Sequence, residues 1–176
     1  GGCELGPRPI DLHLSALRKL GLQIEEQHGG LLCRSEGRMR GTQLTLSFPS
    51  VGATENILLA AATARGRTVL NNAAREPEIT DLADFLNDCG AKISGAGEGV
   101  IVIDGVETLT GCEHRVIPDR IVAATFLSCA ACTGGDVRVR KVEPTHLAGV
   151  LPIFEEMGWR LECGADSVRL RPPERL

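Results

Sequence analysis

The apolar positions of the first twenty residues recur at helical spacing. Steps of three and four residues separate Ile10, Leu14, Leu17 and Leu20. Such spacing places the four side chains on one face, so the pattern predicts a helix with one buried side. Pro9 suits the first turn of this helix, because an N–H at that position would be unpaired, and Gly21 ends it.

Strands and helices then alternate along the chain. Short alternating or apolar runs predict strands over 22–26, 31–34, 42–48, 68–70, 92–94 and 100–104, with a further strand through 116–117. Helices are predicted over 51–65, 77–89, 121–132 and 147–157. The helices 51–65 and 121–132 are so apolar that we expect burial on most sides. Pro152 should kink the last helix unless it lies in the first turn.

The same order of elements recurs along the chain. A constant separation of 68 residues relates Val69, Gly90, Ile93, Val100 and Val102 to Val137, Gly158, Leu161, Val168 and Leu170. A separation of 69 residues relates Gly21, Ile24 and Leu31 to Gly90, Ile93 and Val100. The repeat of about 68–69 residues is a strand–helix–strand–helix–strand–strand unit, which is long enough to be a small α/β layer. We therefore expect an α/β (α+β) fold in which the repeats pack with helices inward and sheets outward.

Composition restricts the function classes. The 176 residues suffice for one ordinary domain or two small ones, and 43% are hydrophobic. A net charge of −4 and an aromatic content of 3% argue against nucleic acid as a partner. No apolar run is long enough for a membrane span, and the first residues do not resemble a secretory signal, so we expect a cytoplasmic protein without a membrane partner.

The seven cysteines do not form a disulfide framework in this interpretation, because their number is odd and they fall within helix and strand patterns. Cys129 and Cys132 have C-x-x-C spacing, but they lie within an apolar helix and no second pair or histidine is near in sequence. Packing in a core is the favoured interpretation for both. We expect no metal ion and no cofactor.

The first residues carry the candidate chemistry. Glycines surround Cys3, so its thiol can lie on an exposed loop, and Arg8 stands next to the start of the first helix. The free N–H groups of that helix start would attract anions and favour a thiolate at Cys3. On the residues alone, a buried, unreactive Cys3 and a solvated Arg8 are the favoured interpretation, because most intracellular cysteines are buried and most single arginines are solvated.

Several strings, in order along the whole chain, resemble motifs of the UDP-N-acetylglucosamine 1-carboxyvinyltransferases, a family of enolpyruvyl transferases. These strings are Gly1-Gly2-Cys3, Gly6-Pro7-Arg8-Pro9-Ile10-Asp11-Leu12-His13, Ser50-Val51-Gly52-Ala53-Thr54, Asn72-Ala73-Ala74-Arg75-Glu76-Pro77-Glu78-Ile79 and Ile117-Pro118-Asp119-Arg120. The resemblance implies two similar domains of three inside-out repeats with the active site in the cleft between them. The chain resembles the middle portion: 1–118 would be part of the domain with the cysteine loop, and 119–176 the incomplete start of the second.

The resemblance also implies an activity. The family transfers an enolpyruvyl group from phosphoenolpyruvate to the 3′-hydroxyl of UDP-N-acetylglucosamine, the first committed step of peptidoglycan precursor synthesis in cell-wall formation. Both compounds are therefore expected substrates of the complete enzyme. The chain alone should be inactive and should self-associate through apolar faces that its neighbours would otherwise cover.

Site residues follow from the same resemblance. Cys3 matches the family's proton donor, which forms the covalent phosphoenolpyruvate adduct and is the residue that fosfomycin alkylates in susceptible members. Arg8 matches an arginine that contacts substrate phosphate. The segment that lines the uridine nucleotide corresponds to Pro9, Ile10, Asp11 and Leu12. The segment near the diphosphate corresponds to Ser50, Val51 and Gly52. Some members have a lysine where this chain has Phe48, and the general base and first phosphate-binding lysine would lie outside the chain.

Some roles stay open. His13 is expected to support the first helix, and hinge support or substrate contact are both plausible for Asp119 and Arg120. The alternative functions are a catalytically silent fragment or nucleotide-sugar-binding module and, less favoured because of the Gly-Gly-Cys context of Cys3, a 3-phosphoshikimate 1-carboxyvinyltransferase.

Overall fold

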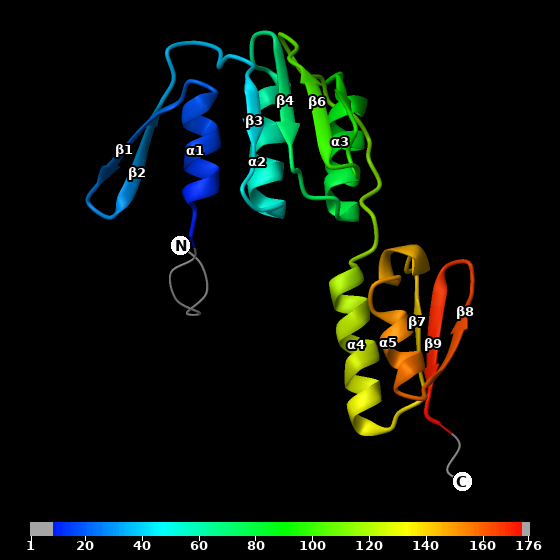
Figure 1. Ribbon diagram of the computed structural model, residues 1–176. Coiled ribbons are helices and arrows are strands. Elements are labelled where there is room, and N and C mark those ends of the chain that lie inside the picture. Colours follow the sequence, from blue (N-terminus) through cyan, green and yellow to red (C-terminus); the bar gives the residue numbers. More distant parts are fainter. Residues whose placement is uncertain (1–8, 174–176) are drawn as a thin grey trace. The chain divides into compact units, whose positions relative to one another are not determined.

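The computed structural model describes residues 9–173 of the chain. The chain folds into two compact units, residues 1–115 and 116–176 (Figure 1). The expected assignment of 1–118 and 119–176 to the two domains of the enolpyruvyl transferase fold remains a prediction.

The first unit is built from three helices and six strands among its described residues. In chain order they are α1 (Asp11–Lys19), β1 (Gln23–Gln27), β2 (Gly30–Arg34), β3 (Gln43–Thr45), α2 (Val51–Ala62), β4 (Arg67–Asn71), α3 (Pro77–Asp88), β5 (Ile93–Ser94) and β6 (Val100–Asp104). Strands β1 and β2 form an antiparallel hairpin next to α1. The other four form a sheet of order β3-β4-β6-β5, in which only β3 and β4 run parallel.

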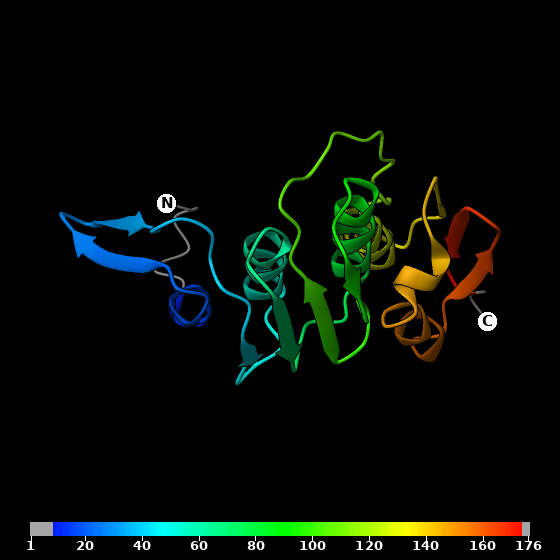
Figure 2. The ribbon, with the colours of Figure 1, turned by 90° about the horizontal axis from the view of Figure 1, so that it is seen from above.

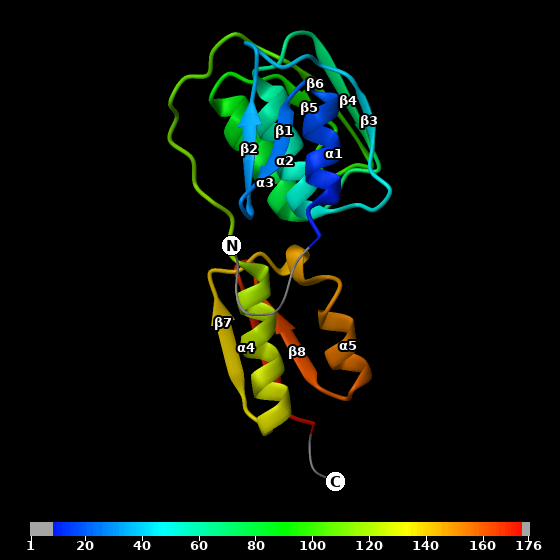
Figure 3. The same cartoon turned by 90° about the vertical axis from the view of Figure 1, so that its left-hand side faces the viewer.

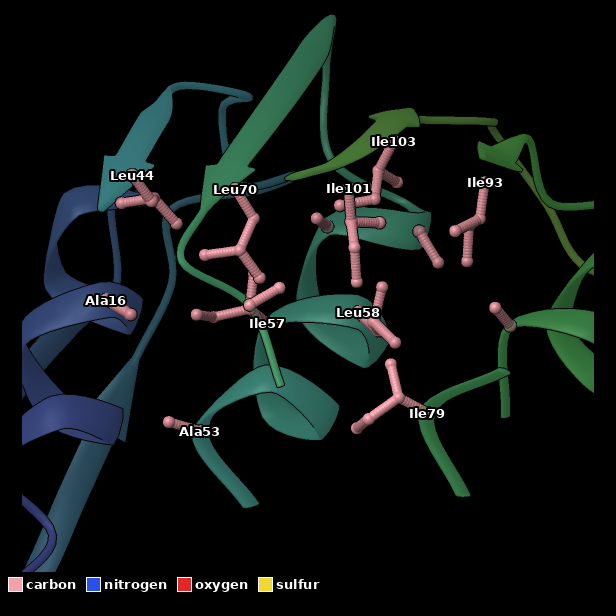
Figure 4. Close-up of a cluster of buried hydrophobic side chains, with 14 of the residues drawn as sticks. Ala16, Leu44, Ala53, Ile57, Leu58, Leu70, Ile79, Ile93, Ile101 and Ile103 are labelled. Carbon is pink, nitrogen blue, oxygen red and sulfur yellow. The ribbon is translucent and has the colours of Figure 1, made fainter. Parts of the chain in front are cut away.

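The core of this unit lies between the four-stranded sheet and the helices (Figure 4). Ile57 and Leu58 of α2 are completely buried beneath the sheet, where Leu70 and Ile101 meet them. Seen from above, α2 and α3 lie on the same side of the strands (Figure 2). Alternation along β6 explains this one-sided packing, because Ile101 and Ile103 are buried whereas Val100 is exposed.

The second unit repeats this arrangement at smaller size. It consists of α4 (Arg120–Thr133), β7 (Val137–Arg140), the 3-10 helix η1 (Pro144–Leu147), α5 (Leu151–Glu156), β8 (Arg160–Cys163) and β9 (Ser167–Arg171). The antiparallel sheet has the order β7-β9-β8, and both α4 and α5 pack against it (Figures 1 and 3). Val168 and Leu170 of β9 are completely buried in the resulting core, together with Leu127 of α4.

The register and the helix ends confirm the sequence repeat. Val69 pairs with Val102 across β4 and β6, and Val137 pairs with Leu170 across β7 and β9, so the pairing is conserved at the 68-residue separation. Gly21, Gly90 and Gly158 each follow a helix with φ of 102°, 98° and 86°. This left-handed conformation is strained for residues with a β-carbon, which explains why glycine recurs there.

The structure decides three local predictions. The strand predicted through 116–117 is wrong: these residues have no regular structure, because no other strand of the described residues lies beside them to pair. Cys129 and Cys132 are exposed on α4 rather than packed in a core. Pro152 lies in the first turn of α5, and η1 replaces the earlier part of the predicted helix, so Pro152 kinks no helix.

Candidate functional site

Three helices of the first unit begin at the same end of the sheet (Figure 1). Parallel strands β3 and β4 end there, and α2 and α3 follow them directly. Helix α1 begins at this end as well, as the figure shows. Free N–H groups at helix starts attract anions, and ligands of α/β sheets bind outside the carboxyl ends of parallel strands. The fold therefore forms a candidate anion-binding edge, which we call the helix-start edge.

Ser50 and Thr54 fix the start of α2. The Ser50 hydroxyl accepts a hydrogen bond from the Ala53 N–H at 3.3 Å and so caps the helix. The completely buried Thr54 hydroxyl donates to the Ser50 carbonyl oxygen at 2.8 Å and accepts from the Ala74 N–H at 3.1 Å. Thr54 thereby joins the first turn of α2 to the loop between β4 and α3.

His13 joins the two predicted binding segments. Asn56 of α2 donates from Nδ2 to His13 Nδ1 of α1 at 2.6 Å. The His13 ring also packs on Gly52, where a β-carbon would lie 3.1 Å from Cε1. The predicted supporting role of His13 thus has a physical form: its ring holds the first turn of α1 against the first turn of α2, and Gly52 supplies the space.

A hollow of about 480 Å³ lies at the same edge, between the loops that follow β3 and β4. It is lined by Pro49, Asn72, Ala73, Arg75 and Glu76. Asn72 has a left-handed backbone with φ of 55°, and its side chain donates to the Leu46 carbonyl oxygen at 2.8 Å. The two loops that bound the hollow are therefore tied together.

Arg75 brings a positive charge to this hollow. Its guanidinium lies against Gly99, since a β-carbon there would come within 2.7 Å of a terminal guanidinium nitrogen. No role was predicted for Asn72, Arg75 or Thr54, although all three lie in strings that carried the family resemblance. That resemblance was the available signal, because helical or strand spacing reveals nothing about contacts between loops.

The predicted site residues divide into two groups. Cys3 and Arg8 lie outside the described residues. Helix α1 begins at Asp11 with Ile10 as its N-cap, so Pro9 precedes the cap and does not lie in the first turn as predicted. All but Leu12 of residues 9–12 are exposed. Ser50 is the N-cap of α2, and Val51 and Gly52 are its first residues. The structure therefore brings the predicted nucleotide and diphosphate segments to one edge.

The remaining predicted positions lie elsewhere or have other roles. Phe48 is 65% exposed, so no burial accounts for this apolar side chain. Asp119 caps α4 by accepting hydrogen bonds from Ile121 and Val122 N–H, each at 2.9 Å. Residues 9–173 contain no cluster of three or more histidine, cysteine or acidic side chains that could hold a metal ion. No helix in the same range is long and apolar enough to cross a membrane.

Comparisons with known proteins agree with this arrangement. The family described as EPSP synthase (3-phosphoshikimate 1-carboxyvinyltransferase) matches residues 1–175. A UDP-N-acetylglucosamine 1-carboxyvinyltransferase of Symbiobacterium thermophilum is 53% identical over 100% of the chain, and one of Staphylococcus aureus is 46% identical over 97%. The chain spans about 40% of the length of these relatives.

Solved structures of the same kind resemble the fold. The enolpyruvyl transferase NikO of Streptomyces tendae matches with a TM-score of 0.80 and 26% identity, over 97% of this chain and 44% of its own. An EPSP synthase of Acinetobacter baumannii matches with a TM-score of 0.66 and 26% identity, over 94% and 40%. The inside-out α/β repeat predicted from the sequence is thus the fold of enolpyruvyl transferases.

Proposed function

This chain belongs to the EPSP synthase family, and from that membership we propose that it contributes to transfer of an enolpyruvyl group from phosphoenolpyruvate to the 3′-hydroxyl of UDP-N-acetylglucosamine. The choice of UDP-N-acetylglucosamine as acceptor rests on one observation. The chain is 46–53% identical, along nearly its whole length, to enzymes named for that sugar nucleotide. In a protein of the relatives' full length, this reaction would begin the synthesis of peptidoglycan precursors.

The chemistry requires a proton donor and an anion site. Enolpyruvyl transfer needs a proton at the methylene carbon of phosphoenolpyruvate, so that the adjacent carbon becomes electrophilic while the phosphate charge is held. We assign the proton donor to Cys3, whose thiol can both donate a proton and form a covalent adduct. We assign phosphate contact to Arg8, because a guanidinium can pair two N–H groups with phosphate oxygens.

The helix-start edge supports binding of the sugar nucleotide. Residues 9–12, of which all but Leu12 are exposed, would contact the uridine, and the N–H groups at the start of α2 would face the diphosphate. The His13–Asn56 hydrogen bond and the packing on Gly52 hold these two segments in one arrangement. Preorganisation of this kind reduces the entropy lost on binding.

The decisive experiment measures phosphate release from phosphoenolpyruvate by a full-length protein that carries this chain. Cys3→Ala should lower the rate with UDP-N-acetylglucosamine by a factor on the order of 100 or more, as expected for loss of a general acid. Cys33→Ala, which removes an exposed cysteine of β2, is the matched control and should leave the rate unchanged. Full activity of Cys3→Ala would contradict the assignment.

The acceptor is tested in the same assay. Replacing UDP-N-acetylglucosamine with shikimate 3-phosphate should abolish phosphate release. Phosphate release with shikimate 3-phosphate but not with UDP-N-acetylglucosamine would instead indicate a 3-phosphoshikimate 1-carboxyvinyltransferase. The 176-residue chain by itself should show no turnover. Binding of UDP-N-acetylglucosamine without turnover by the full-length protein would instead favour a silent binding module.

A further inference from the structure

Cys89 and Cys112 form a close pair of thiols away from the helix-start edge. Their sulfur atoms lie 3.3 Å apart, and both cysteines are free. We propose that this pair is a reversible oxidation site, at which a peroxide converts the two thiols into a disulfide that fastens the chain after β6 to the end of α3. The proposal is independent of the transferase function.

The two cysteines come from elements of different character. Cys89 ends α3 and is 6% exposed. Cys112 lies in the segment after β6, residues 109–115, which we call the strap and which has no regular secondary structure. A disulfide needs a sulfur separation of about 2.05 Å, so the sulfurs must approach by roughly 1 Å. An irregular segment can make this movement more easily than a helix.

Contacts on both sides of Cys112 hold the strap over α3. Thr110 donates from its backbone N–H to the Cys89 carbonyl oxygen at 2.8 Å, and from its hydroxyl to the same oxygen at 3.1 Å. His114 Nε2 lies 2.9 Å from Asp81 Oδ1, and its ring meets Phe85 edge-on at 5.5 Å. The pairing of the two sulfurs therefore results from several independent contacts rather than from one flexible rotamer.

The reaction balances with hydrogen peroxide as the oxidant. The Cys112 sulfur, the more accessible of the two, takes one oxygen atom and becomes a sulfenic acid while one water leaves. The Cys89 sulfur then attacks the Cys112 sulfur, the S–O bond breaks, and a second water carries away both the oxygen and the remaining thiol proton. Two electrons leave the thiols and two reduce the peroxide.

The protonation state of Cys112 determines the pH at which the pair is oxidised. Its hydrogen bond with Cys89, followed by desolvation and the charges of Cys89 and Asp88, raises the pKa of Cys112 to about 11. Because the thiolate is the reactive form, oxidation should be slow near neutral pH and is best followed at about pH 9.

The test treats the 176-residue chain and the full-length protein with hydrogen peroxide, blocks free thiols by alkylation, and maps the peptides by mass spectrometry. The expected result is one linked peptide pair that contains Cys89 and Cys112 and disappears after reduction with dithiothreitol. The disulfide would join residues that are 23 positions apart in the sequence. Closing a loop of this length restricts the unfolded chain, so the melting temperature should rise by roughly 5–10 °C.

Two variants make the result decisive. Cys112→Ser should remove both the linked pair and the rise in melting temperature, whereas Cys163→Ser, which removes an exposed cysteine of β8, should retain both. Complete alkylation of Cys89 and Cys112 after peroxide treatment would show that both thiols are still free and would overturn the proposal. A rise in melting temperature that persists in Cys112→Ser would overturn it as well, because another group would then be responsible.

Discussion

The inner helices of the two units, α2 and α4, share a plan but differ in the surface that they bury. Aligned on their N-caps, Leu58 of α2 corresponds to Leu127 of α4, and both are completely buried against their own sheets. The preceding residues, Ile57 and Phe126, also correspond, but Ile57 is completely buried whereas Phe126 is 60% exposed.

The neighbours of the helices explain this difference. Helix α1 packs beside α2, and Ala16 of α1 and Ala53 of α2 belong to one core. Among residues 116–173, no comparable helix covers the rest of the surface of α4, and Phe126, Cys129 and Cys132 are all exposed there. An apolar sequence thus indicates that a helix face can be buried, whereas the neighbouring elements determine whether it is.

The largest expected effect tests this contrast directly. Ile57→Ala should lower the free energy of unfolding of the first unit by about 2–5 kcal/mol, because it leaves a cavity in a close-packed core. Phe126→Ala should change that of the second unit by only about 0.5 kcal/mol, as exposed substitutions do. Circular dichroism follows both units, and fluorescence of the single tryptophan, Trp159, follows the second.

Leu127→Ala is the matched control for Phe126→Ala, since it truncates the buried neighbour and should shift the Trp159 transition strongly. Equal losses of stability from Leu127→Ala and Phe126→Ala would contradict the difference in burial between these two side chains. If the exposed face mediates the predicted self-association, Phe126→Ala should also reduce the concentration dependence of light scattering.

The comparison shows how much of the fold the sequence predicts. Hydrophobic spacing located the α-helices but not η1, and glycines such as Gly90 and Gly158 revealed the repeat, because each pattern has a local physical cause. The exposure of Cys129 could not be predicted, since it depends on which elements pack nearby. The predicted strand at 116–117 failed for the same reason, because a strand needs a partner as well as β propensity.

Prediction of the site had a similar limit. The apolar spacing and the family resemblance located the starts of α1 and α2, but Pro9 lies before the N-cap of α1 and not in its first turn. The bond from Ala74 N–H to Thr54 joins residues that are 20 positions apart, and the contact between His13 and Asn56 spans 43 positions. Such contacts have no characteristic sequence spacing, so they become visible only in the fold.

The second largest effect concerns a buried hydroxyl that α2 has and α4 lacks. Thr54→Val keeps the shape of the side chain but leaves the buried Ala74 N–H without its partner, which should cost the first unit about 1–3 kcal/mol. The corresponding residue of α4 is Ala123, which has no hydroxyl. Thr54→Ser retains the hydroxyl and should lose less stability in urea unfolding followed by circular dichroism. Equal losses from Val and Ser would point to lost packing instead.

Removal of the N-caps should give a smaller difference in stability between the two units, and here the second unit should lose more. Asp119→Ala removes two hydrogen bonds at 2.9 Å, whereas Ser50→Ala removes one at 3.3 Å. Replacing a cap by alanine typically costs about 0.5–2 kcal/mol, so Asp119→Ala should lie toward the upper end and Ser50→Ala toward the lower. Denaturant midpoints of the two units measure this, with Asp119→Asn as the variant that keeps a capping oxygen. A larger loss at Ser50 would contradict the order.

The smallest effect concerns His114 of the strap and should appear as a different pH dependence of the two units. The hydrogen bond to Asp81, with a smaller contribution from Asp88, raises the pKa of His114 above the usual 6.5, and burial opposes this shift only in part. The resulting stability is complete below the unfolded pKa and disappears as pH rises through the folded pKa. In the second unit, the hydrogen bond from Arg169 instead lowers the pKa of Asp136, whose stabilisation disappears only as pH falls through its lowered pKa.

Raising the pH from about 6 to about 8.5 should therefore weaken the first unit through His114 and leave the Trp159 transition of the second unit unchanged. His114→Gln keeps a polar side chain but cannot gain a proton, so its first unit should not respond to this change of pH. The measurement is thermal unfolding at both pH values, by circular dichroism and by Trp159 fluorescence. An equal response of the wild type and His114→Gln would show that the contact between the strap and α3 does not depend on the charge of His114.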